Sequence, residues 1–281
     1  TKEYKQQCVE IGTQNNLKMA NPELAAAVEE GRKRMFEETK KRWEVKQEPK
    51  QESQIEEKKQ LFERYAEAVG AEKFRVLVTE FTPEGVQAFV FDRKNGGLDG
   101  KTKDELLEAM GKLESYAKYN KNINVVPISP DKHHILIDDI SVEGLEQLKE
   151  DGYRPSCVIE SSPNNFQAIL TVPSLEGDRE KDREAANKLT KDLNVRYGDP
   201  KLSGAVHAHR LPPFGNFKPK HRREDGTYPR THLVEAQGGM CGKAAINLKA
   251  AQEWLKEQEQ KILREQEHRQ RSASVMTGLS G

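Results

Sequence analysis

Two adjacent carboxylates at the end of an apolar run are the residues of this chain best suited to chemistry. Asp138 and Asp139 follow Ile135-Leu136-Ile137, a run that predicts a buried strand. Carboxylate oxygens at a strand tip suit Mg²⁺, which takes one or two carboxylates and leaves room for substrate phosphates. A simpler interpretation stays open here, in which one aspartate caps a helix beginning near Ser141 and the other faces water. Because neighbours on a regular strand point to opposite faces, one shared metal site requires the strand to end or bend between them.

Two polar segments further along the chain could complete such a site. Residues 160–167 form a predicted hairpin turn rich in Ser, Asn and Gln, whose side chains can hold a sugar, base or phosphate. A plain turn around Pro163 is the alternative. Asp199 precedes Pro200 and is therefore expected in extended backbone, as a candidate third metal ligand. Gly-Asp-Pro also occurs as ordinary loop chemistry, so this signal is weak by itself.

A basic stretch follows. Residues 201–232 contain seven Lys and Arg against two Asp and Glu, together with four of the seven histidines. The whole chain has a formal net charge of zero, so this local excess, with Phe214 and Phe217 interleaved, suits a polyanion. A solvated basic loop is the alternative. The Gly-rich segment 238–244 is no phosphate-binding P-loop, because it lacks the leading Gly and the Ser or Thr after Lys243.

Composition narrows the class of protein. The 281 residues are 35% hydrophobic and 33% charged, which predicts long solvated helices around a smaller core. The three cysteines are odd in number and share no close spacing, so a disulfide framework is not expected and a reducing cytoplasm fits best. No apolar stretch approaches the roughly 20 residues that span a bilayer, so no membrane contact is expected.

The chain divides into three predicted parts. Residues 1–70 read as a helical lead-in, with helix starts at Asn21-Pro22 and at the capping box that begins with Ser53. Residues 71–245 alternate strands with helices, which predicts an α/β or α+β domain with helices packed on a sheet. Residues 246–281 form a charged C-terminal helix and tail.

The order of these motifs resembles the RepB-type plasmid DNA primases of the archaeo-eukaryotic primase superfamily, over about residues 72–240. The resemblance implies a mixed central sheet flanked by helices and the template-directed synthesis of short primers for plasmid replication or conjugative transfer. It implies Mg²⁺ or Mn²⁺ as the cofactor and single-stranded DNA and nucleoside triphosphates as partners. A replicative helicase and a relaxase domain are further expected partners, because the family includes relaxase–primase fusions, which a helical lead-in would suit.

The resemblance assigns roles residue by residue. It makes Asp138, Asp139 and Asp199 the catalytic metal-binding acids. The implied nucleotide-binding residues are Ser162, Asn165, Gln167, Arg210, Asn216 and Lys218. The implied DNA-binding residues are Lys220, His221, Arg222 and Arg223. Many superfamily members have His where this chain has Gln167, and since an amide cannot act as a general acid, only binding is implied there.

Three functions follow from these residues. The first is a metal-dependent nucleotidyltransferase that makes primers. The second is a non-catalytic single-stranded-DNA-binding module of a relaxase or replication initiator, which Gln167 and the short C-terminal region favour. The third is a metal-dependent nuclease that uses the same acids.

Overall fold

The structure is a computed structural model that describes residues 30–31, 33–34, 37 and 50–278. Its contacts divide the chain into two compact units, 1–54 and 55–281. The helix expected from Asn21-Pro22 lies outside the described residues. Within the part that is described, no helix combines the length and the apolar content that a membrane span requires.

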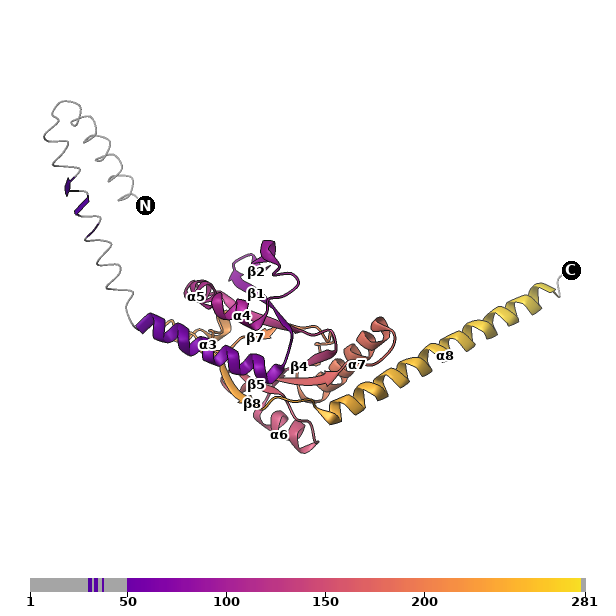
Figure 1. Cartoon of the computed structure of the whole chain (residues 1–281). Helices are drawn as coiled ribbons and strands as arrows, with labels where there is room; N and C mark the ends of the chain where they lie inside the picture. The colour runs from indigo at the N-terminus through magenta and orange to yellow at the C-terminus, as the bar shows by residue number, and fades with distance from the viewer. Residues whose placement is uncertain (1–29, 32, 35–36, 38–49, 279–281) are drawn as a thin grey trace, which may run out of the picture. The chain divides into compact units, whose positions relative to one another are not determined.

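The strands of the second unit form two four-stranded antiparallel sheets (Figure 1). Sheet A has the order β2-β1-β3-β7, and sheet B has the order β4-β6-β5-β8. The strands are β1 (Lys73–Thr82), β2 (Gly85–Val90), β3 (Asn122–Ile128), β4 (Lys132–Ile140), β5 (Cys157–Ser162), β6 (Asn165–Pro173), β7 (His209–Arg210) and β8 (His232–Ala236).

The helices pack on these two sheets. They are α3 (Lys50–Val69), α4 (Lys103–Glu108), α5 (Met110–Lys118), α6 (Val142–Glu150), α7 (Arg179–Tyr197) and α8 (Gly242–Gly278), with short 3-10 turns η1 (Arg93–Asn95) and η2 (Pro219–His221). The expected α/β class is confirmed, and the strands are shared between two sheets.

Strand periodicity produces two apolar cores, one on each face of sheet B. Alternate residues of β4 belong to different cores. Leu136 packs between the sheets, while Ile135 and Ile137 face α6, α7 and α8. The core between the sheets also receives one face of β1, one face of β3, and the apolar sides of α3, α4 and α5. Sheet B is therefore the central layer, and its residues near Asp138 are fixed from both sides.

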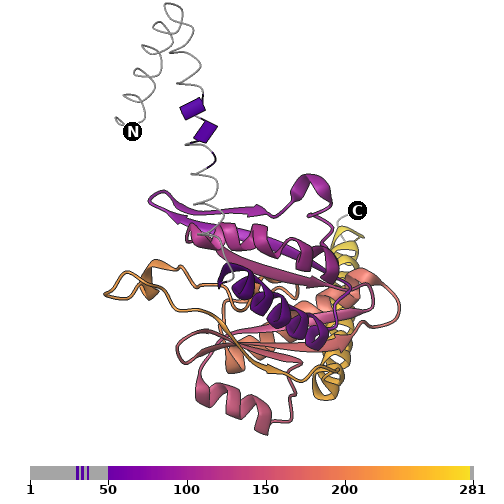
Figure 2. The ribbon, with the colours of Figure 1, turned by 60° about the vertical axis from the view of Figure 1, so that its left-hand side comes forward.

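Helix α3 is part of the core between the sheets. Phe62, Tyr65 and Val69 are almost completely buried there, and α3 lies beside both sheets in Figure 2. The expected helix start at Ser53 was wrong, since α3 already begins at Lys50. Helix α4 begins with a capping box at Thr102, whose hydroxyl accepts a hydrogen bond from the Glu105 amide.

The core role of α3 can be tested at Phe62, which is fully buried. Replacing Phe62 by Ala should lower the free energy of unfolding by about 3–5 kcal/mol, because it removes a large apolar side chain and leaves a cavity. Urea denaturation measures this loss. The matched control is Phe89→Ala, whose side chain is 43% exposed, and equal losses in the two variants would contradict the packing of α3.

Candidate active site

Strand β4 bends at the acidic pair. Its pairing with β6 shifts register between Ile137 and Ile140, and Asp139 has a φ of 52°. A shift of this kind is a β-bulge, and the left-handed region is rare for residues other than Gly, Asn and Asp. The chain therefore meets the geometric condition that two adjacent acids impose on a shared site.

The two carboxylates reach the same face of β6. The Gln167 Nε2 donates a hydrogen bond to Asp138 Oδ1 at 2.8 Å, and the Asn165 Nδ2 donates to Asp139 Oδ1 at 3.1 Å. Because Asn165 and Gln167 are two residues apart on one strand, their side chains point to the same side. The second oxygen of each carboxylate accepts no hydrogen bond from the residues that the structure describes, so it can take a ligand.

The last turns of α7 hold the bulge by backbone contacts. Asn194 accepts a hydrogen bond from the Asp138 amide at 3.0 Å and donates one to the Leu136 carbonyl at 2.8 Å. The Asp199 amide donates to the Asp138 carbonyl at 2.8 Å. A Cβ atom on Gly198 would lie only 2.2 Å from that carbonyl oxygen, so the close approach requires glycine.

Asp199 lies beside the pair, but its carboxylate serves a turn. Its Oδ1 accepts a hydrogen bond from the Lys201 amide at 2.9 Å. Among the described residues, no group of three or more His, Cys, Asp or Glu side chains is arranged to hold a metal ion. Asp138 and Asp139 still suit Mg²⁺ in their donor chemistry, because two carboxylates with substrate phosphates are a common way to bind that ion.

Arg210 brings a buried positive charge to the acids. It is 6% exposed, and its backbone amide donates to Gln167 Oε1 at 2.9 Å. Its Nη2 donates to Asn216 Oδ1 at 3.0 Å, and the Asn216 amide group donates to the Ser161 carbonyl at 2.7 Å. Burial lowers the pKa of Arg210 to about 10, and the charge of Asp138 opposes that shift. Asn216 thus holds the guanidinium within electrostatic reach of the Asp138 carboxylate.

One nitrogen of this guanidinium has no partner. Arg210 Nη1 is buried and makes no hydrogen bond within the described part of the chain. Buried polar groups are nearly always paired, so an unpaired donor calls for a physical explanation. An anionic ligand that accepts from Nη1 would supply one, because charge-assisted hydrogen bonds to phosphate or carboxylate are strong.

The hairpin turn after β5 positions Asn165. Asn164 adopts a φ of 60° behind Pro163, as a two-residue turn requires, and its amide donates to the Glu160 carboxylate at 3.0 Å. Ser161 donates to Asn165 Oδ1 at 3.3 Å, whereas Ser162 is buried in the turn. The neighbouring Ser161, which the sequence analysis did not select, is the serine that supports the acid pair.

The basic loop between β7 and β8 projects from the two sheets (orange in Figure 2). Lys220, Arg222 and Arg223 are exposed. Burial lowers the pKa of His221, and the charges of Lys220, Lys218 and Arg210 lower it further, while that of Asp139 opposes them. The loop therefore lies within electrostatic reach of the acids.

Two buried histidines form structural hydrogen bonds outside the acidic site. His209 hydrogen bonds the Tyr65 hydroxyl at 2.8 Å, and burial lowers its pKa to about 3. His134 contacts the hydroxyls of Ser129 and Thr171, and burial lowers its pKa to about 4, with Lys132 and His133 adding to the shift. Both imidazoles are neutral at pH 7 and act as structural hydrogen-bonding groups.

Paired carboxylates, a buried guanidinium with an unpaired donor, and an exposed basic loop are groups whose chemistry suits a protein that binds phosphorylated ligands. More specifically, the chain belongs to the RepB DNA-primase family, because the model of the RepB DNA-primase N-terminal domain matches residues 67–261.

Two relatives and two solved structures are similar to this chain. A DNA primase of Acidithiobacillus ferrooxidans is 48% identical over 184 residues, which are 65% of this chain and 52% of the relative. Mobilization protein A of Escherichia coli is 27% identical over 218 residues, which are 77% of this chain and 28% of that protein. The chain thus spans about half the length of the first relative and less of the second.

The solved structures establish the fold. The catalytic domain of primase RepB′ in complex with initiator DNA is 22% identical with a TM-score of 0.56, covering 72% of this chain and 97% of that one. A structure of primase RepB′ is 23% identical with a TM-score of 0.59, covering 78% of this chain and 68% of that one.

The support that Gly198 gives to the bulge predicts a local effect of substitution. Gly198→Ala should lower the free energy of unfolding by about 1–3 kcal/mol, because the added methyl group must push the end of α7 away from β4. Gly204→Ala is the matched control, since an added Cβ there meets nothing closer than 3.9 Å. Thermal denaturation of the two variants measures the difference, and equal stabilities would contradict the contact.

The low pKa of His134 predicts a pH dependence of stability. The pKa of His134 is about 6.5 in the unfolded chain and about 4 in the folded chain. Between these values the unfolded chain binds a proton that the folded chain does not, so the free energy of unfolding falls as the pH drops through this window. In His134→Gln this contribution is absent, and the slope should be shallower by up to about 1.4 kcal/mol per pH unit. Urea denaturation between pH 7 and pH 5 measures both slopes, and identical slopes would contradict a neutral, buried His134.

Proposed function

We propose that this chain is the catalytic part of a DNA primase that joins nucleotides on a single-stranded DNA template. The observation that supports the proposal is the Gln167 bridge, which hydrogen bonds both the Asp138 carboxylate and the Arg210 backbone amide in a member of the RepB primase family. A negative site for a cation and a positive site for a phosphate lie next to each other, as nucleotidyl transfer needs.

Each side chain has a distinct part in this reaction. Asp138 and Asp139 would hold Mg²⁺ or Mn²⁺, with Asp199 as a third ligand if its carboxylate leaves the turn. A bound divalent ion supplies charge neutralisation and activation of the attacking hydroxyl. Arg210 would donate Nη1 to the triphosphate, and the Asn216 side chain fixes the plane of that guanidinium.

The remaining predicted residues would bind the polyanions. Lys218 and His221, which lies within electrostatic reach of Asp139, would contact the nucleoside triphosphate or the template. Lys220, Arg222 and Arg223 are exposed on the same loop and would bind template phosphates by charge, which makes affinity depend on salt. Asn165 and Gln167 would position the acids and face the nucleotide.

The relatives suggest a setting for this activity. Because the chain is similar to part of a mobilization protein, we propose that it acts beside a relaxase domain in a longer polypeptide, in the cytoplasm, during plasmid replication or conjugative transfer. A replicative helicase is a further proposed partner of such a primase.

A primer-synthesis assay tests the proposal. The protein is incubated with single-stranded DNA, Mg²⁺ or Mn²⁺ and labelled nucleoside triphosphates, and oligonucleotide products are measured. Asp138→Asn should reduce synthesis at least about a hundredfold, because it removes charge where the cation binds. Asp99→Asn, a change of the same kind at an exposed loop position, should leave synthesis unchanged. Full activity of Asp138→Asn would contradict the assignment.

A single-stranded-DNA-binding module without catalysis is the second candidate. The observation in its favour is the Asp199 carboxylate, which is engaged with the Lys201 amide. Salt-dependent DNA binding without any oligonucleotide product would select this function. DNA cleavage in the absence of nucleoside triphosphates would select the nuclease.

Arg210 gives a second prediction for the primase. Arg210→Lys keeps the positive charge but loses the planar fork of donors that reaches both Asn216 and a phosphate. The KM for nucleoside triphosphate should rise roughly tenfold, since one charge-assisted hydrogen bond is lost. Steady-state kinetics with Lys191→Ala as the control measures the change, and an unaltered KM would remove Arg210 from the triphosphate site.

A further inference from the structure

A cavity of about 560 Å³ lies between sheet A and the first turns of α7. Its polar lining includes Arg75, Lys132, Arg179, Arg183 and His207. Its apolar lining comes from Val126, Pro127, Ile128, Pro130, Leu175 and Val206. A volume of this size accommodates a small organic ligand such as a nucleotide.

The cavity is separate from the acidic pair. Lys132, His133 and His134 line it at the first residues of β4, whereas Asp138 and Asp139 lie near the last residue of that strand. Six residues of extended strand between Lys132 and Asp138 correspond to about 20 Å. Helix α7 runs the same way, because its first turn contributes Arg179 to the cavity and its last turns hold the bulge.

The charges in the cavity favour an anion. Arg179 and Arg183 are four residues apart at the start of α7, where they repel each other and oppose the helix dipole. Both are exposed, and neither forms an ion pair or hydrogen bond with the residues that the structure describes. The acid of the lining, Asp182, is engaged by His133 at 2.8 Å and by the Leu175 amide at 2.9 Å. The two guanidinium groups are therefore available to an anionic ligand.

One face of sheet A connects the cavity with the active site. Arg75 of β1 lies opposite Val126 of β3, and Asn124 of β3 lies opposite Arg210 of β7. Directly opposed residues share a face, and Asn124 and Val126 are two apart, so all four side chains project from the same face. A single DNA strand that runs from Arg210 across this face of sheet A would reach Arg75 and the cavity.

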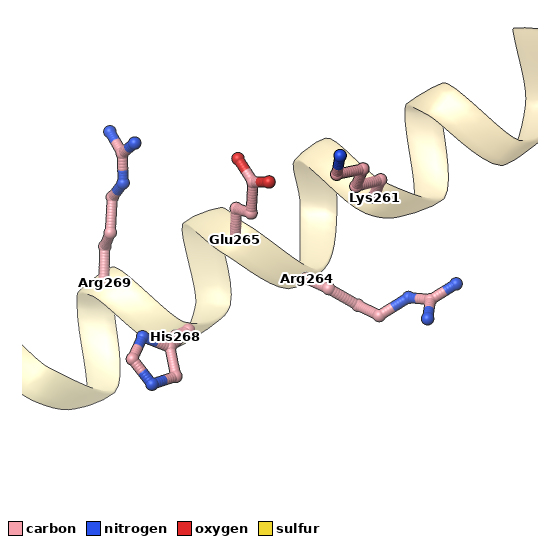
Figure 3. Close-up of a pocket in the computed structure, with 5 residues that line it drawn as sticks. All are labelled: Lys261, Arg264, Glu265, His268 and Arg269. Atoms are coloured by element: carbon pink, nitrogen blue, oxygen red, sulfur yellow. The ribbon is translucent and has the colours of Figure 1, made fainter.

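Another hollow is a weaker candidate. It is lined by Lys261, Arg264, Glu265, His268 and Arg269, all from α8. Figure 3 draws Arg264 and His268 below the ribbon and Lys261, Glu265 and Arg269 above it, all on this single helix. The surface of a single helix cannot enclose a ligand. The cavity beside α7 is lined by several elements and is therefore the stronger candidate for a binding site.

We propose that this cavity binds a phosphate-bearing nucleotide of the single-stranded DNA template, about 20 Å along β4 from the acidic pair. The phosphate contacts Arg179 and Arg183, and the sugar and base pack on the apolar lining near Val126 and Pro130. Since no Phe, Tyr or Trp lines the cavity, binding depends on phosphate contacts and tolerates any base. The inference rests on the proposed function for its template strand.

Fluorescence anisotropy with a labelled oligothymidine tests the site. The full chain carries Asp138→Asn, and nucleoside triphosphates are left out, so that binding is measured apart from catalysis. Adding Arg179→Ala and Arg183→Ala should weaken binding roughly tenfold or more. Each lost contact should also lower the slope of log affinity against log salt by about 0.7. Lys191→Ala, an exposed cation of the same helix outside the cavity, should change neither quantity.

The outcomes separate this site from the primase proposal. Unchanged affinity and slope in the double-arginine variant would overturn the cavity as a template site, while primer synthesis by the wild type would stand. A wild type that makes no primer, combined with a loss of binding in the variant, would remove the primase and leave the site. Competition with thymidine monophosphate separates the two sources of a nucleotide. If the variant loses only the free nucleotide and keeps the oligonucleotide, the template placement is wrong.

Discussion

The side chain of Gln167 is the interaction on which the site depends. Its amide nitrogen donates to the Asp138 carboxylate of sheet B, and its amide oxygen accepts from the Arg210 backbone of sheet A. One buried residue therefore links the acid to the backbone of Arg210 and holds an edge of one sheet to the face of the other. Because both halves of the amide are used, neither an acid nor an apolar residue of similar size can replace it.

This constraint works only because β4 bulges at the acidic pair. A regular strand would turn Asp139 away from β6, whereas the left-handed backbone at Asp139 brings it to Asn165. The end of α7 then secures the bulge through Asn194 and through the space that Gly198 leaves. The geometry of the acidic pair thus depends on both cores, since α7 packs in the core on the other face of sheet B.

Local sequence patterns predicted those elements of the fold that depend on neighbouring residues alone. The apolar run before Asp138 located β4, and the polar turn residues around Pro163 located the hairpin between β5 and β6. The division into two sheets and the two-residue strand β7 depend on pairing between distant segments, which periodicity does not encode. Residue chemistry identified Asp138 and the family resemblance pointed to Arg210, but the bridge between them is a tertiary contact. The sequence contained one weak indication of the role of Asn194, which is a polar residue on the buried side of α7.

The most direct test of this account is primer synthesis by Gln167→Leu, a substitution that keeps the side-chain size and removes both hydrogen bonds. The variant should fold, as judged by cooperative urea denaturation, and make at least about tenfold less primer than the wild type, because Asp138 and Arg210 are no longer held together. Primer synthesis at the wild-type rate by a folded Gln167→Leu protein would contradict it.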